Sequence, residues 1–149
     1  MQKIIRVMMM SAALMGLVGQ LALGEDQDNN EDLYHYLEGR YIVIGRVING
    51  AKTYQGTVDL VYEKGRLGVT RKINGLVIKG EGRIEHALGT DKADVLRVRY
   101  IQDGKDYEIT YVWNSDLDNY PRLSGYLYES GKKTDSPGLE ALFRDHAQK

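Results

Sequence analysis

The segment 114–119 has the spacing of a calcium-binding loop. Asn114, Asp116 and Asp118 place oxygen-bearing side chains at alternate positions, and alternate residues of a tight loop point toward one centre. Such a loop needs a bidentate glutamate at its twelfth position, where this chain has Gly125. We therefore favour a polar turn made of residues with high turn propensity, and keep the calcium loop as the weaker alternative.

The other polar residues show no catalytic signature. The chain has no cysteine, three histidines far apart in sequence and no Gly-x-Ser-x-Gly motif. The histidines match no short metal-binding motif. Glu81 and Glu85 would lie about 13 Å apart on one strand face, beyond the roughly 5–9.5 Å between paired carboxylates of glycoside hydrolases. We expect a protein that is not an enzyme and carries no cofactor.

Aromatic residues offer the best candidates for a binding site. The chain has 11 Tyr, one Trp and one Phe. His86 lies two residues after Ile84 and so has the same parity, which means that both side chains lie on the same face of the strand. We therefore expect His86 to face inward at the mouth of the predicted barrel. An eight-stranded barrel has room for packed side chains or for one small ligand, so inward rings either fill the core or surround a ligand. The candidate ligand-binding residues are Tyr54, Tyr62, Tyr107, Tyr111, Trp113 and His86.

Three further tyrosines indicate an alternative role. Tyr126 and Tyr128 have the opposite parity and should be exposed. With Tyr120 they could form a surface patch for a protein or a glycan. In that case the chain would be an interaction module with a filled core.

The elements that must position these residues are strands. From Leu33 to Tyr128 apolar and polar residues alternate with a period of two, and turn residues interrupt the pattern every 8–12 positions or so. Asn74-Gly75 predicts a two-residue hairpin turn, because both residues tolerate positive φ. The pattern predicts seven strands, the clearest over 53–63 and the first over 36–47, and it allows an eighth around 128–133.

The fold class predicted is all-β: an antiparallel up-and-down meander of seven or eight strands, closed or nearly closed into a barrel. Short connections favour pairing of sequence neighbours. Glycines inside the strands fit a strongly curved sheet, so we prefer a barrel to a sandwich. Charges on the second face, such as Arg83 and Arg97, cannot face lipid, which argues against an outer-membrane barrel.

One short helix is predicted near the C-terminus, at about 137–146. Ser136 can cap it, Pro137 suits its first turn, and Leu139, Leu142 and Phe143 form one apolar stripe. We expect it to cover an end or a side of the sheet.

The first 24 residues have the layout of a cleaved secretory signal peptide. Lys3 and Arg6 precede an apolar run over 7–18, and Ala22-Leu23-Gly24 provides small residues for cleavage. An uncleaved anchor is the alternative. We expect a signal peptide over 1–24, a disordered acidic leader over 25–32 and a single domain over 33–149 that is periplasmic or secreted.

The charge of the exported chain argues against nucleic acid as a partner. Removing Lys3 and Arg6 from a chain of 20 basic and 21 acidic residues leaves a net charge of −3. Acidic domains are poor partners for nucleic acid or an anionic membrane.

Short motifs in chain order resemble the calycin-type barrels, lipocalin-like and avidin-like, including short exported bacterial domains sometimes labelled fibronectin-binding. The motifs are Gly39-Arg40-Tyr41, Tyr54-Gln55-Gly56, Gly80-Glu81-Gly82, Val95-Leu96-Arg97-Val98 and Leu123-Ser124-Gly125-Tyr126. The resemblance covers about 90 residues, and the biotin-binding residues of the avidins do not map onto this chain. It implies a small barrel that binds an apolar or amphipathic molecule, whereas the alternative is an interaction module for an envelope or extracellular protein.

Overall fold

The computed structural model describes residues 28–87, 93–115 and 119–147. The predicted signal peptide lies outside these ranges. The described residues form one helix and eight strands: α1 (Asp28–Leu37), β1 (Gly39–Arg46), β2 (Thr53–Tyr62), β3 (Leu67–Ile73), β4 (Leu76–His86), β5 (Asp94–Gln102), β6 (Lys105–Ser115), β7 (Pro121–Glu129) and β8 (Gly138–Arg144).

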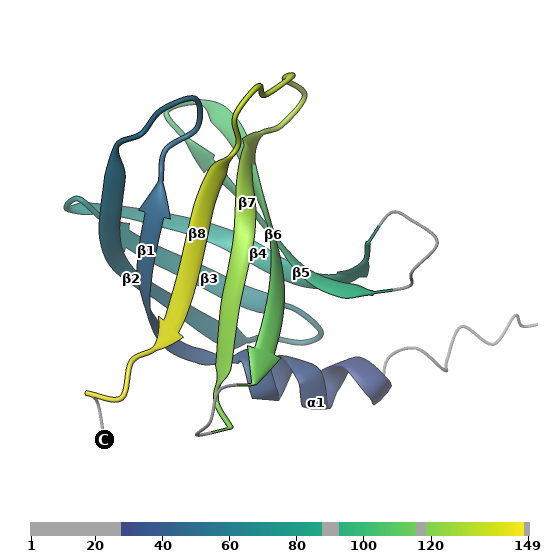
Figure 1. Ribbon diagram of the computed structural model, residues 1–149. Coiled ribbons are helices and arrows are strands. Elements are labelled where there is room, and N and C mark those ends of the chain that lie inside the picture. Colours follow the sequence, from purple (N-terminus) through teal and green to yellow (C-terminus); the bar gives the residue numbers. More distant parts are fainter. Residues whose placement is uncertain (1–27, 88–92, 116–118, 148–149) are drawn as a thin grey trace, which may run out of the picture.

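The strands form one closed antiparallel barrel in which each strand pairs with its neighbours in sequence (Figure 1). β8 closes the barrel against β1, from Tyr41 opposite Arg144 to Arg46 opposite Leu139. The prediction of an up-and-down barrel is therefore confirmed, and the sandwich alternative is wrong. Closure pairs the two strand edges that an open sheet would leave exposed.

Two hairpin turns are formed by pairs of residues with positive φ. Asn74 and Gly75 join β3 to β4 with φ of 50° and 79°, which are the two positive values that a type I′ turn requires. Asp103 and Gly104 join β5 to β6 in the same way, with φ of 51° and 72°. The turn predicted at Asn74-Gly75 is confirmed.

The prediction of a C-terminal helix is wrong, because residues 138–144 form the strand β8. Along this strand Gly138, Glu140 and Leu142 are buried inside the barrel, while Leu139 and Phe143 are exposed outside it. The apolar stripe of a helix and the alternation of a strand overlap in so short a segment. Pairing with both β1 and β7 decides between them. An eighth strand around 128–133 is also wrong, since β7 ends at Glu129.

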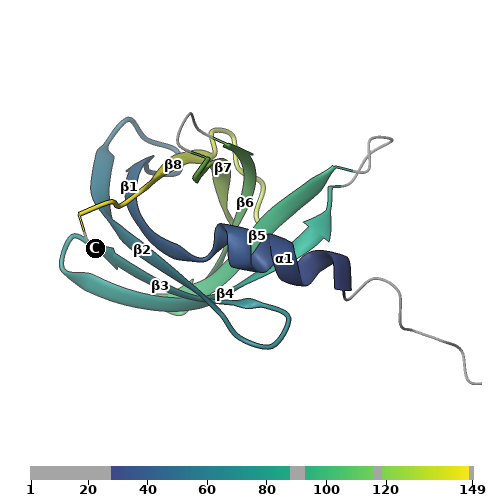
Figure 2. The ribbon, with the colours of Figure 1, turned by 90° about the horizontal axis from the view of Figure 1, so that it is seen from below.

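The one helix in the described residues, α1, comes before the barrel in the chain and covers one end of it (Figure 2). It includes Asp28 to Asp32, which we expected in a disordered leader, and β1 begins at Gly39 rather than at residue 36. Leu37 is fully buried, and its carbonyl accepts a hydrogen bond of 2.6 Å from the hydroxyl of Tyr41. At the same end, the Tyr34 hydroxyl accepts one of 3.1 Å from the backbone N–H of Ile84.

Charged side chains cover much of the outer face of β4, β5 and β6, as the alternation predicts. Arg99 contacts Glu85 at 2.6 Å and Glu108 at 2.9 Å, and Arg97 contacts the same two carboxylates at 3.2 Å each. In the described part of the chain, the helix is too short and too polar to cross a bilayer.

Candidate functional site

The end of the barrel opposite α1 contains a pocket of about 310 Å³. Aliphatic side chains form much of its wall, and three tyrosines and one arginine add polar groups. The β1–β2 connection and the β3–β4 and β5–β6 hairpins contribute residues to the rim. Its lining residues are Val47, Ile48, Tyr54, Arg71, Ile73, Asn74, Leu76, Ile78, Tyr100, Gln102, Tyr107 and Leu127.

A buried ion pair lies inside the barrel beside this pocket. Arg71 on β3 and Glu140 on β8 are only 2% and 3% exposed. Nη1 of Arg71 donates to Oε2 of Glu140 at 3.0 Å, and Nη2 donates to Oε1. The pair is therefore bidentate, the strongest geometry for an arginine and a carboxylate.

Two tyrosine hydroxyls complete the hydrogen bonding of Glu140. Tyr54 donates to Oε1 and Tyr111 donates to Oε2. Each oxygen of Glu140 thus accepts two hydrogen bonds, one from Arg71 and one from a tyrosine. We call Arg71, Glu140, Tyr54 and Tyr111 the interior polar cluster.

The interior polar cluster keeps both of its charges. Burial alone would raise the pKa of Glu140, but the charge and hydrogen bonds of Arg71 and the two tyrosine hydroxyls lower it below the usual value. Burial alone would lower the pKa of Arg71, and the charge of Glu140 raises it well above the usual value instead. The cluster therefore contains one positive and one negative charge, and its net charge is zero.

Tyr100 and Tyr107 form the aromatic part of the pocket. Their rings are stacked, with centroids 5.4 Å apart and planes at 19°. The guanidinium of Arg71 lies 5.0 Å from the centroid of the Tyr100 ring, within the range of a cation–π contact. Among the described residues, neither hydroxyl of this stacked pair has a hydrogen-bond partner, and neither is a buried atom, so both remain accessible from the pocket.

The structure separates the aromatic residues that parity placed together. Tyr54 and Tyr107 line the pocket, and Tyr111 is fully buried in the interior polar cluster. Tyr62 and Trp113 are partly buried and pack against the core, and Tyr62 contacts the rings of two α1 residues, Tyr34 and His35. Parity predicts the face of a strand on which a residue lies, but not the end of the barrel.

The expectation that His86 faces inward is wrong. Its side chain is 75% exposed, and Nδ1 lies 2.7 Å from the carboxylate of Asp94 on the paired strand. His86 is the last residue of β4, where the strand has left the core. It does not line the pocket.

Sequence reasoning missed Arg71, Glu140 and Tyr100. Arg71 lies between Val69 and Ile73 on the inward parity of its strand, so its parity was the available signal. Glu140 could not be found in this way, because its segment was predicted to be a helix. Tyr100 shares the inward parity of Leu96 and Val98, and the same rule would have included it.

The candidate calcium loop cannot be assembled from the described residues. Asp116 and Asp118 lie outside them, and Asn114 is exposed near the end of β6. Within residues 28–87, 93–115 and 119–147, no three His, Asp or Glu side chains are grouped so as to hold a metal ion.

The three surface tyrosines are exposed, as predicted, but they do not form one patch. Tyr126 and Tyr128 are neighbours on the outer face of β7, with ring centroids 6.4 Å apart. Tyr120 instead contacts His146 edge to face at 4.9 Å, and Arg144 lies over its ring.

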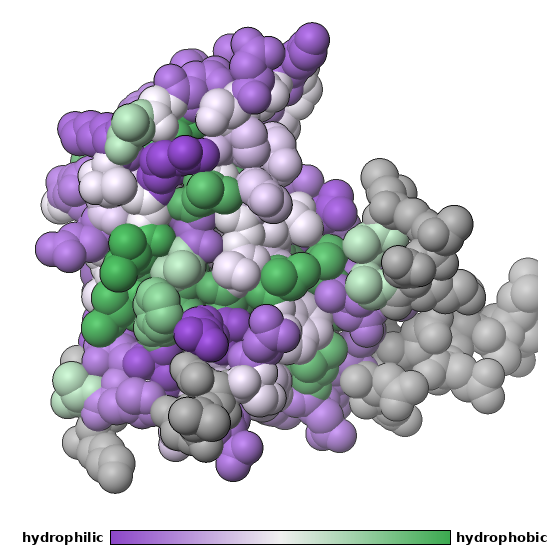
Figure 3. All heavy atoms as spheres, in the orientation of Figure 1, coloured by the Kyte–Doolittle hydropathy of each residue, from purple (hydrophilic) through white to green (hydrophobic). Residues whose placement is uncertain are grey.

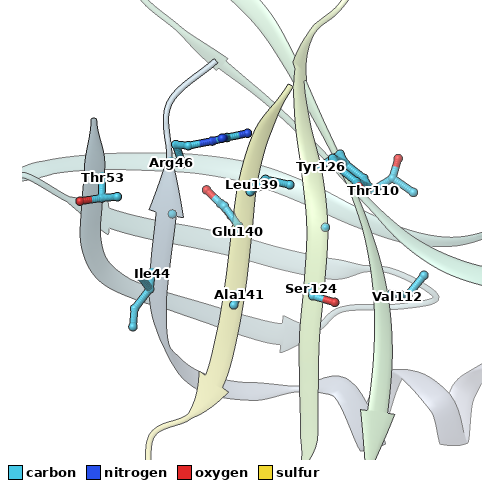
Figure 4. A pocket seen from close by; sticks show the side chains of 12 residues that line it. Ile44, Arg46, Thr53, Thr110, Val112, Ser124, Tyr126, Leu139, Glu140 and Ala141 are labelled. Atoms are coloured by element: carbon cyan, nitrogen blue, oxygen red, sulfur yellow. The ribbon is translucent and has the colours of Figure 1, made fainter. Parts of the chain in front are cut away.

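The outer wall has another, open hollow of about 660 Å³ across β1, β8, β7 and β6, with Thr53 of β2 at its edge. Ile44, Ala141, Ser124 and Val112 lie in one row across β1, β8, β7 and β6 (Figure 4).

Comparison with known proteins adds no functional information. The sequence matches no protein-family model and no curated protein. The closed eight-stranded antiparallel barrel is compatible with the calycin-like architecture.

Proposed function

We propose that this protein binds a small amphipathic molecule in the pocket at the open end of its barrel. The observation that carries the proposal is the contrast between the two ends. Side chains of α1 fill one end, whereas the other has a pocket of about 310 Å³ with aliphatic walls and convergent polar groups. Apolar walls with a few placed polar groups are typical of small-molecule sites.

The calycin-type resemblance and the N-terminal segment support the same proposal. Small calycin-type barrels hold ligands inside the barrel, and this chain has a pocket in that position. We propose that the chain is exported through its N-terminal segment and binds its ligand outside the cytoplasm. Mass spectrometry of the mature N-terminus tests the export, with cleavage after Gly24 as the expected result.

Native mass spectrometry of the purified protein tests whether a ligand is retained. A titration with N-phenyl-1-naphthylamine, an uncharged fluorescent probe, tests the pocket itself. We expect saturable binding of one probe per chain. A failure of the probe to bind, together with the absence of a retained ligand, would overturn the proposal.

Two adjacent residues supply matched variants for this titration. Both residues are exposed, but Leu76 lines the pocket at its rim, whereas its neighbour Val77 does not line it. Leu76→Asp places a charge in the apolar wall, and we expect it to weaken probe binding about tenfold, which corresponds to about 1.4 kcal/mol. Val77→Asp adds the same charge outside the pocket, and we expect no change. Equal effects of the two substitutions would place the probe elsewhere.

A further inference from the structure

We infer that the part of the ligand that reaches the interior polar cluster is an uncharged hydrogen-bonding group, such as an alcohol, a phenol or an amide. This inference rests on the proposed function, and it specifies the class of ligand. A carboxylate or an ammonium group at that position is disfavoured.

The charge balance of the interior polar cluster is the first reason. A ligand carboxylate would meet the negative charge of Glu140 as well as the positive charge of Arg71, so the two contributions largely cancel. Both Nη groups of Arg71 already donate to Glu140. Nε of Arg71 is buried without a hydrogen-bond partner, so one donor remains for a ligand oxygen. A ligand charge would lose its hydration beside a guanidinium whose charge Glu140 already balances, which costs several kcal/mol, whereas an uncharged oxygen avoids most of that cost.

The hydroxyls of Tyr100 and Tyr107 are the second reason. A phenol hydroxyl donates one hydrogen bond and also accepts one, so these two hydroxyls can satisfy both the donor and the acceptor of an alcohol or an amide. Burial, above all, raises the pKa of Tyr100 to about 12, and the hydroxyl therefore keeps its proton at neutral pH. Neither hydroxyl is engaged by another described residue.

The pocket volume limits the size of the ligand. About 310 Å³ lies at the lower end of the roughly 300–1,000 Å³ range of small-molecule pockets. Two fused rings with a substituent fit this space. A bicyclic probe with interchangeable polar groups is therefore a suitable test ligand.

The test compares naphthalene-2-carboxamide with 2-naphthoate, which differ in charge but little in shape. Each compound competes with N-phenyl-1-naphthylamine for the wild-type protein at neutral pH. We expect the carboxamide to bind at least tenfold more tightly. Equal or tighter binding of the naphthoate overturns the inference while leaving the proposed function intact, whereas a failure of the fluorescent probe to bind, together with the absence of a retained ligand, overturns the proposed function.

Glu140→Gln provides a second arm, because it leaves the charge of Arg71 without a carboxylate partner. The preference should then shift toward the naphthoate by at least tenfold relative to the wild type. Glu63→Gln changes an exposed carboxylate outside the pocket and should leave the preference unchanged. A folded Glu140→Gln variant that retains the wild-type preference contradicts the inference. If this variant does not fold, the wild-type comparison decides alone.

A separate observation concerns the outer wall. Large apolar side chains gather on the outer face of β1, β8, β7 and β6, and Figure 3 shows them as a band across this side of the molecule. They are between 37% and 52% exposed. We call them the outer apolar face: Ile42, Ile44, Val112, Tyr126, Leu139 and Phe143.

We propose that a second copy of this chain covers the outer apolar face in a two-fold dimer. A fully exposed aromatic side chain presents roughly 150–250 Å² and an aliphatic one roughly 60–120 Å², so these fractions leave on the order of 300 Å² of apolar area. A stable interface buries about 800 Å² per partner, and about 65% of a homodimer interface is apolar. The face therefore provides more than half of the apolar area that one half of a homodimer needs.

Sedimentation velocity across a micromolar to sub-millimolar range tests the dimer. We expect Ile44→Glu to shift the protein to monomer, because it puts a charge in the central row of the face (Figure 4). Ile101→Glu is the matched control, since Ile101 is also exposed but lies on β5, and it should leave the dimer intact. A monomeric wild type, a dimer that survives Ile44→Glu, or wild-type binding to neutral phosphatidylcholine vesicles that Ile44→Glu abolishes would each overturn the proposal.

Discussion

Glu140 on β8 accepts hydrogen bonds from both Nη groups of Arg71 on β3. One ion pair therefore joins two strands that are not neighbours in the sheet. The pair crosses the interior and lies beside the pocket. Burying two charges costs several kcal/mol per ion, and such pairs often add little net stability. The interior polar cluster is therefore better explained by a role in the proposed binding site than by a role in stability.

The first prediction concerns this pair. Arg71→Met and Glu140→Gln should each lower the free energy of unfolding by about 3–5 kcal/mol, because each leaves one buried charge without its partner. The double variant should lose at least about 1 kcal/mol less than the sum of the two. Urea unfolding of the four proteins measures this coupling, and additive effects would contradict it.

Acid should destabilise the protein through Glu140. Its pKa is lower in the folded state than its usual value, so its contribution to stability is present above the unfolded pKa of about 4.3 and is lost as the pH falls through the folded value. Glu140→Gln should therefore show a smaller loss of stability between neutral pH and about pH 3 than Glu63→Gln. Urea unfolding at the two pH values provides the comparison. Equal losses would show that Glu140 contributes nothing to the pH dependence.

Alkali should destabilise the protein through its interior tyrosines. Burial, as the main cause, raises the pKa of Tyr41 and Tyr100 to about 12, and it raises the pKa of Tyr54 and Tyr111 as well. Their contribution is complete below the unfolded pKa of about 10 and is lost as the pH rises through the folded values. Absorbance at 295 nm should show that these four tyrosines ionise only as near-UV circular dichroism is lost. Complete ionisation of the folded protein near pH 10 would contradict this.

Gly45 positions Tyr54. A Cβ at Gly45 would lie 2.3 Å from Cζ of the Tyr54 ring, whereas a Cβ at Gly82 would meet Cδ1 of Leu96 at 3.2 Å. Gly45→Ala must therefore displace the ring of Tyr54, and we expect it to lower stability by about 1–3 kcal/mol. It should also weaken probe binding, since Tyr54 lines the pocket.

Gly82→Ala is the matched control, because this glycine also faces the interior but meets side-chain atoms that can shift. It should leave probe binding unchanged. Equal loss of binding in both variants would show that any added methyl inside the barrel disturbs the pocket, and that Gly45 has no special relationship with Tyr54.

Local sequence patterns were sufficient to predict most of the strands, most of their inward and outward faces and the hairpin turn at Asn74-Gly75. These depend on neighbours a few residues apart: alternation in Val58 and Leu60 assigns a face, and Asn74-Gly75 supplies the positive φ of a turn. The strand at 138–144 could not be predicted locally, because its state depends on pairing with β1 and β7 in the folded barrel. The tertiary structure also decided which rings meet the pocket, since parity does not distinguish the two ends of a barrel. Arg71 and Glu140 are 69 residues apart, and their contact exists only because closure brings β3 and β8 to opposite sides of one interior.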